Sequence, residues 1–261
     1  MRFTGKGRGT TVTPAAGTAA ALRAVRAGPG QAAKSAKKAV IAGIAFAALF
    51  TAGLILVNQI PRLGSPDSTY TAFYSAGSGG VLVTVGLYLV PFAGIAFLWF
   101  TMAFRALLDR PGRLTESLHM ASGVAFICML FAGTAAAGAV ALMLHFADVA
   151  PPPASVDRAL SSVGYGLVFV YGVRMAGMFA ITTTTLARRA GLIPGWLAVL
   201  SYLMAVFLLV TTTTQPATLL VFPAWVLVMS VALLRSTRVQ SRPAPAESQH
   251  VRTHTLMGEL S

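Results

Sequence analysis

Residues 163–196 read VGYGLVFVYGVRMAGMFAITTTTLARRAGLIPGW. The run is mainly apolar, holds Arg174 near its middle, and ends with Arg188 and Arg189 before a short link. A continuous apolar run of this length predicts a helix that crosses a lipid bilayer. Arg174 is the one charge that falls inside any predicted span, and a charge at that depth is a candidate for a functional site.

The composition of the whole chain agrees with this reading. The protein has 261 residues, of which 56% are hydrophobic and 10% charged, and its mean hydropathy is +0.72. Soluble globular domains of this length do not normally have such a composition. Because lipid cannot satisfy backbone hydrogen bonds, continuous apolar runs cross it as helices. The predicted fold class is therefore all-α, a polytopic membrane helix bundle.

Six apolar stretches predict six transmembrane helices within a domain of residues 39–235. Prolines at 61, 151–153 and 194 separate several of them. The residues before and after this domain are polar and rich in small residues, which predicts disordered tails over 1–38 and 236–261. The predicted spans are about 39–58, 80–104, 121–147, 160–186, 194–210 and 217–234.

The net charge of +13 lies almost entirely outside the spans. Seventeen of the twenty Lys and Arg residues fall on one side of the predicted topology, and only Arg62 and Arg158 fall on the other. The positive-inside rule then places both termini in the cytoplasm. We expect the basic tails to contact anionic lipids of the bilayer, and we do not expect a nucleic-acid partner.

Arg174 is expected to face the bundle interior or a wet cavity near the bilayer midplane, since burying it in lipid is costly. No carboxylate is predicted at its depth. Pro91 and Pro223 each remove a backbone donor, which frees the carbonyl four residues earlier. The expected partners of Arg174 are the backbone carbonyls of Leu87 and Leu219, together with Tyr171 and Thr134.

Two functions fit such a site. Arg174 could bind an anionic group, which predicts a small permease or a lipid- or anion-binding component. Alternatively, it could only link helices, in a structural or partner-binding membrane subunit. Small residues such as Gly133 and Ala137 predict close packing of the third span on the fourth, or a face for a homo-oligomer. Nucleophile-elbow, zinc-protease and P-loop motifs are absent from the sequence, which disfavours an enzyme.

His145 and Asp148 are three residues apart at the end of the third span, and we expect them to form an interfacial pair. Two ligands are too few for a zinc site, and Cys128 is the single cysteine. The other histidines, at 119, 250 and 254, are expected in loops or the tail without ligand spacing. We therefore expect neither a metal nor a cofactor.

The last third of the chain resembles uncharacterised six-span membrane proteins of actinobacteria. The resemblance rests on Thr182–Arg189, on the link Gly191–Leu197, and on Phe222–Val228. These features mark helix ends and a proline kink. The resemblance implies a location in the bacterial cytoplasmic (inner) membrane and no particular activity, and Arg174 lies just outside the matched part.

Overall fold

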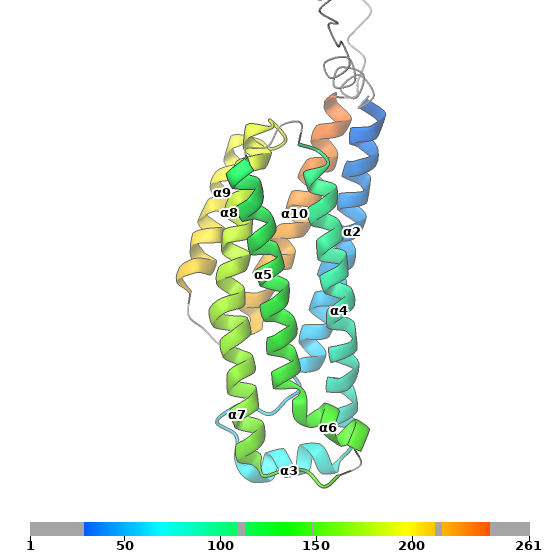
Figure 1. Ribbon diagram of the computed structural model, residues 1–261, viewed down its shortest axis with the longest axis vertical. Coiled ribbons are helices and arrows are strands. Elements are labelled where there is room, and N and C mark those ends of the chain that lie inside the picture. The colour runs from blue at the N-terminus through cyan, green and yellow to red at the C-terminus, as the bar shows by residue number, and fades with distance from the viewer. Residues whose placement is uncertain (1–28, 109–112, 148, 212–215, 241–261) are drawn as a thin grey trace, which may run out of the picture.

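A computed structural model describes residues 29–108, 113–147, 149–211 and 216–240, and within these ranges the chain forms helices and no strand. Figure 1 shows an elongated bundle. The helices are α2 (Pro29–Val57), α3 (Asp67–Ser75), α4 (Ser78–Arg105), α5 (Arg113–Ala137), α6 (Ala139–Ala147), α7 (Ala154–Tyr165), the π-helix η1 (Gly166–Gly172), α8 (Val173–Arg189), α9 (Gly195–Val210) and α10 (Pro216–Gln240).

Several of these helices are suited to a membrane, which confirms the predicted class in its general form. In the described part of the chain, five stretches are long and apolar enough to cross a bilayer: Lys34–Val57, Gly79–Arg105, Leu114–Ala137, Ala154–Arg189 and Ala217–Ser236. The fifth predicted span, 194–210, corresponds to α9, which is apolar but has only 16 residues. Its length of about 24 Å is below the hydrocarbon thickness of about 30 Å.

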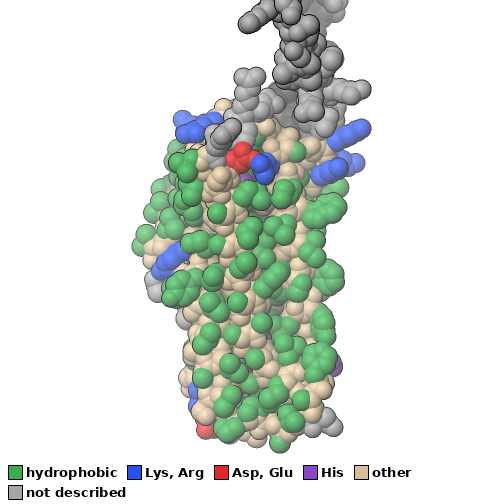
Figure 2. Space-filling view, in the orientation of Figure 1, with side chains coloured by type: hydrophobic (Ala, Val, Ile, Leu, Met, Phe, Trp, Pro, Cys, Tyr) green, Lys and Arg blue, Asp and Glu red, His purple; other side chains and the backbone are tan. Residues whose placement is uncertain are grey.

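The two ends of the bundle differ in chemistry. The basic end carries Arg105, Arg188, Arg189 and Arg235, and both the start of α2 and the end of α10 lie there (Figure 1). The capped end is closed by the short helices α3 and α6, which lie beside the start of α7. Between the two ends, hydrophobic side chains cover the visible flank (Figure 2). This arrangement suits a flank that faces lipid.

The fourth predicted span is longer than expected. α7, η1 and α8 together form one run of 36 residues, Ala154–Arg189, which is about 54 Å long. That exceeds the hydrocarbon thickness, so one end of this helix extends beyond it. The helix starts directly after Pro153, and its first turns are polar but buried, at Asp157 and Ser161.

The third predicted span, 121–147, is divided in the structure. α5 begins at Arg113 and ends at Ala137, and Gly138 separates it from α6. A Cβ atom on Gly138 would lie 2.4 Å from Leu87 Cδ1, so the chain packs closely against a side chain of α4 at this point. Gly138 therefore lies toward the capped end and not at middle depth.

Helical structure also extends into the predicted tails. α2 begins at Pro29, ten residues before the predicted first span, and α10 continues to Gln240. The remainder of both predicted tails, residues 1–28 and 241–261, lies outside the described residues.

Five phenylalanines, one from each of the five long apolar runs, pack together at the centre of the bundle. Neighbouring ring centroids lie 4.8 Å apart for Phe97 and Phe179 and 4.9 Å apart for Phe126 and Phe222. We call this group the phenylalanine cluster: Phe46, Phe97, Phe126, Phe179 and Phe222. All five side chains are buried, so the middle of the bundle is filled.

Candidate functional site

Arg174 lies on α8 directly after the π-helix, and its side chain is partly buried. Its Nη1 donates a hydrogen bond to the carbonyl oxygen of Val170 at 2.5 Å. In a π-helix each N–H bonds to the carbonyl five residues earlier, whereas in an α-helix it bonds to the carbonyl four residues earlier. Where η1 passes into α8, one carbonyl is therefore left without a backbone N–H donor. Helical side chains incline toward the N-terminus, so this bond holds the guanidinium toward the capped end.

The last turn of α9 lies beside Arg174. A Cβ atom on Gly177 would lie 3.0 Å from Ala205 O and 3.0 Å from Leu209 Cγ, so α8 and α9 touch at that level. Arg174 is about one helical turn closer to the capped end. α9 ends at Val210, close to that depth, and the last carbonyls of a helix have no intrahelical donor.

The structure places the predicted partners of Arg174 in different surroundings. Tyr171 is 57% exposed on the flank. The Thr134 hydroxyl donates back to its own helix, to Leu130 O at 2.7 Å. Leu87 packs beside Gly138 near the capped end, and Leu219 is buried at the hollow described next. Arg174 does not line that hollow.

A hollow of about 60 Å³ lies between the phenylalanine cluster and the capped end. α2, α4, α5, η1 and the start of α10 surround it, and its surface is mainly apolar. Because α10 begins only at Pro216, it does not separate α2 from α7 nearer the capped end. The residues that line the hollow include Phe50, Leu54, Val57, Val90, Leu130, Thr134, Val168, Phe169 and Leu219.

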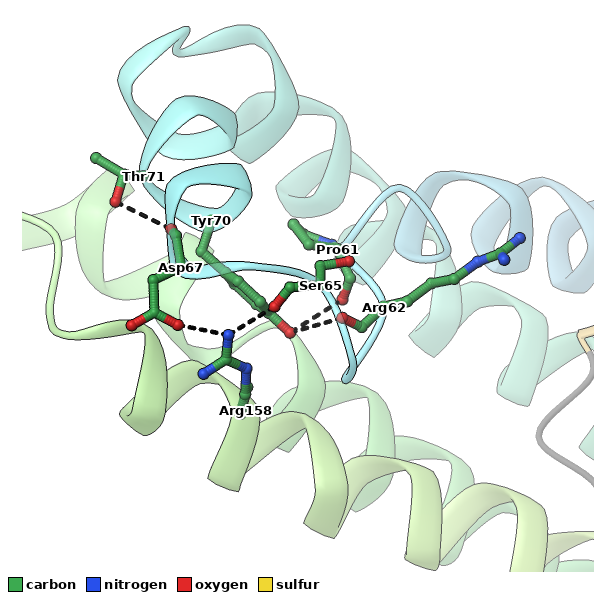
Figure 3. Close-up of polar contacts among 7 residues, drawn as sticks. All are labelled: Pro61, Arg62, Ser65, Asp67, Tyr70, Thr71 and Arg158. Carbon is green, nitrogen blue, oxygen red and sulfur yellow. Dashed lines mark hydrogen bonds and ion pairs between the residues drawn. The ribbon is translucent and has the colours of Figure 1, made fainter.

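Polar groups stand at the rim of this hollow. Asn58 and Tyr165 line it, and Arg62 lies close enough to Tyr165 to act on it electrostatically. Arg62 is exposed and forms no ion pair with any described residue. Its side chain extends away from the neighbouring polar cluster (Figure 3). Arg62 is not among the residues that line the hollow, but its charge lies near Tyr165 at the rim and has no ion-pair partner among the described residues.

That neighbouring cluster fixes the loop before α3 to α7. Arg158 forms an ion pair with Asp67 at 2.5 Å and donates to the carbonyl of Ser65 at 2.6 Å (Figure 3). The Arg158 guanidinium also lies over the ring of Tyr70, 5.0 Å from its centroid. The Tyr70 hydroxyl donates to the carbonyl of Arg62 at 3.0 Å. These contacts fix the position of the Arg62 backbone.

His119 is a second polar residue in the interior, and the expectation that it lies in a loop is wrong. α5 already begins at Arg113, and His119 is 0% exposed. Its Nδ1 lies 3.1 Å from Thr183 Oγ1, while that hydroxyl donates to Phe179 O at 2.7 Å. Since a hydroxyl has one hydrogen, Nδ1 must carry the proton and donate to Thr183.

The other nitrogen of His119 has no hydrogen-bond partner among the described residues. Its ring stacks on Phe179 at 4.5 Å and lies 5.4 Å from the ring of Phe104. The sequence held a signal for this position. His119 shares a helical face with Gly123 and Phe126, which pack into the same core.

The predicted pair of His145 and Asp148 lies partly outside the described residues, because Asp148 is not among them. His145 is exposed on α6, with its ring 4.9 Å from that of Phe146. Among the described residues, no group of three or more His, Cys, Asp or Glu side chains could hold a metal ion.

Comparisons with protein-family models, with curated proteins and with solved structures found no match for this chain. The function must therefore be argued from the hollow, its rim and Arg174.

Proposed function

We propose that the protein is an integral membrane protein of the bacterial cytoplasmic membrane that binds an anionic lipid or a related amphiphile. The observation that carries this proposal is the apolar hollow with an arginine near its rim, Arg62, which has no ion-pair partner among the described residues. An apolar chain fits the lining, and a guanidinium binds phosphate or carboxylate groups well.

The proposed topology places this ligand in the outer leaflet. The concentration of Lys and Arg at one end supports a cytoplasmic location for that end and for both termini. In this topology α9 and α10 form the last two of six spans. The hollow then lies at the depth of outer-leaflet acyl chains, and Arg62, Asn58 and Tyr165 lie where headgroups begin.

A binding function fits the interior better than a permease does. The phenylalanine cluster fills the bundle centre with contributions from five runs. A hollow of about 60 Å³ holds only a few water molecules, since one water needs roughly 10–15 Å³ of such volume. A continuous aqueous route would require these aromatic side chains to separate.

Arg174 supplies a deeper anion contact in this proposal. Its guanidinium is held at the level of Val170 and inclined toward the proposed outer side. Tyr171 is exposed on the same flank and offers a hydroxyl. An arginine can extend toward a headgroup from within the bilayer, which reduces the cost of its depth.

The test is lipid retention by the purified full-length protein. Wild type, Arg62→Gln, Arg174→Leu and the control Arg188→Gln are purified in a mild detergent with added phosphatidylglycerol, and the bound lipid is quantified by mass spectrometry. We expect Arg62→Gln to retain about tenfold less, because loss of one charge-assisted bond costs about 1.5–3 kcal/mol. Arg174→Leu is expected to retain less, and Arg188→Gln is expected to match wild type.

A second variant tests the hollow itself. Leu54 lines it and is partly buried, so Leu54→Phe fills space without removing any charge. Retention of phosphatidylglycerol should fall while the thermal midpoint stays near that of wild type. Equal retention by all variants would contradict the proposal.

The alternative is a structural or partner-binding subunit, and the position of Arg174 beside the end of α9 favours it. A guanidinium there stabilises the unpaired carbonyls of a helix that ends within the bilayer. A second copy or another membrane protein would then pack on the apolar flank. Arg174→Leu would melt far below wild type without any change in bound lipid.

A further inference from the structure

A buried carboxyl group lies at the capped end, in the first turn of α7. Asp157 is 1% exposed, and neither of its carboxylate oxygens has a hydrogen-bond partner among the described residues. Ser161 lies one turn later on the same face and is 0% exposed, and its hydroxyl also lacks a partner within the described part of the chain. From α3, the buried Tyr74 hydroxyl approaches Asp157 without forming a hydrogen bond of normal geometry.

The nearby arginines do not neutralise this carboxyl group. Arg158 follows Asp157 in the chain, but its guanidinium is bound to Asp67 and Ser65 and lies over Tyr70. Arg62 is exposed and extends away from the cluster (Figure 3).

Apart from Tyr74, the other ionisable groups among the described residues offer Asp157 no partner either. The charged residues of α5 lie near the basic end, on its first turns. The titratable or charged groups on the elements that pack against this part of α7, and on the preceding link, are Arg62, Asp67, Tyr70, Tyr74, His145, Arg158 and Tyr165.

A carboxylate buried without any hydrogen bond is strongly unfavourable, whereas a neutral acid can both donate and accept. Burial, and next the charge of Asp157, raises the pKa of Tyr74, so the tyrosine keeps its proton and remains a donor. A protonated carboxyl, a tyrosine hydroxyl and a serine hydroxyl can satisfy one another with small side-chain movements. A proton also needs no additional space, unlike a metal ion.

We propose that Asp157 binds a proton in the folded protein, and that the neutral carboxyl group, supported by Ser161 of the same helix, joins α7 to α3 through Tyr74. The group forms a proton-dependent latch at the capped end. Loss of the proton places an unpaired negative charge between α3 and α7 and separates them. This inference stands on the capped end alone and does not depend on lipid binding.

The experiment follows the thermal midpoint of the full-length protein from about pH 5 to about pH 9. Ionisation of Asp157 costs the folded state more than the unfolded state, so the folded state binds more protons. The stabilisation that the protonated Asp157 provides is therefore fully present at low pH. It is lost as the pH rises far enough to ionise Asp157 in the folded protein. We expect the wild-type midpoint to fall with rising pH and the Asp157→Asn midpoint to stay nearly constant.

The control is Asp67→Asn, which removes an exposed carboxylate from the same end. It is expected to keep the wild-type pH slope. Equal slopes in wild type and Asp157→Asn would overturn the proposal. So would a wild-type midpoint that rises with sodium concentration at fixed pH and does not do so in Asp157→Asn, since a metal cation would then occupy the site.

Infrared spectroscopy gives a readout that does not require a folded variant. A protonated buried carboxyl shows a carboxylic acid C=O band, which hydrogen exchange into D₂O shifts. Wild type near neutral pH should show this band, and Tyr74→Phe should move it by removing one donor. Absence of the band in wild type would overturn the proposal by itself.

Discussion

At the scale of single residues, the buried His119 depends on one hydroxyl. Thr183 accepts from His119 Nδ1 and donates to Phe179 O, whereas the neighbouring Thr182 hydroxyl bonds only within its own helix among the described residues. Thr183→Val keeps the side-chain shape but leaves the imidazole N–H without an acceptor. We expect a loss of about 1–3 kcal/mol in the free energy of unfolding.

Thermal and denaturant unfolding in one detergent measures this loss. The matched control is Thr182→Val, which removes a hydroxyl on the same helix turn and should cost less than 1 kcal/mol, roughly the value of a weak local hydrogen bond. Equal destabilisation by the two variants would show that His119 does not rely on Thr183.

At the scale of elements, the contact of α5 with α7 requires glycine. A Cβ atom on Gly164 would lie 2.6 Å from Gly133 O and 2.8 Å from Ala137 Cβ. Neither Gly133 O nor Ala137 Cβ can move unless α5 itself moves. Gly164→Ala therefore forces the helices apart, with an expected cost of about 1–3 kcal/mol. The close contact agrees with the prediction that small residues pack the third span on the fourth.

The control for this prediction is Gly166→Ala, only two residues away. A Cβ atom there would meet nothing within 4 Å. Because alanine has a higher helix propensity than glycine, this variant should be neutral or slightly more stable in thermal unfolding. If Gly164→Ala also melts like wild type, the helices are packed less closely than the structure indicates.

At the scale of the whole molecule, the topology predicts which end is accessible from outside the cell. Ser68 on α3 and Ala190 in the link after α8 are both exposed, at opposite ends of the bundle. In a Cys128→Ala background, we expect a membrane-impermeant thiol reagent to label Ser68→Cys in intact cells. The reagent should label Ala190→Cys only after the membrane is opened, because segments rich in Lys and Arg stay in the cytoplasm. The reverse pattern would refute the proposed orientation.

The sequence by itself determined that the protein lies in lipid and that its secondary structure is helical. Apolar runs longer than about 18 residues cannot remain in water and cannot leave their backbone unpaired in lipid, so they become membrane helices. Five of the predicted spans match long apolar helices, although their ends differ by up to ten residues, as at the end of the third span. Helix ends were harder to predict because helices also extend into polar segments, as at Pro29 and Ala154.

Only the tertiary structure decided which polar groups are buried together. Asp157 in a first helical turn and His119 in a polar segment both look exposed in the sequence. Their burial depends on the fold of α3 over α7 and on the early start of α5. The hollow depends on where α10 begins, and the π-helix before Arg174 has no local sequence signal. These features arise from contacts between distant segments, which local hydrophobicity cannot specify.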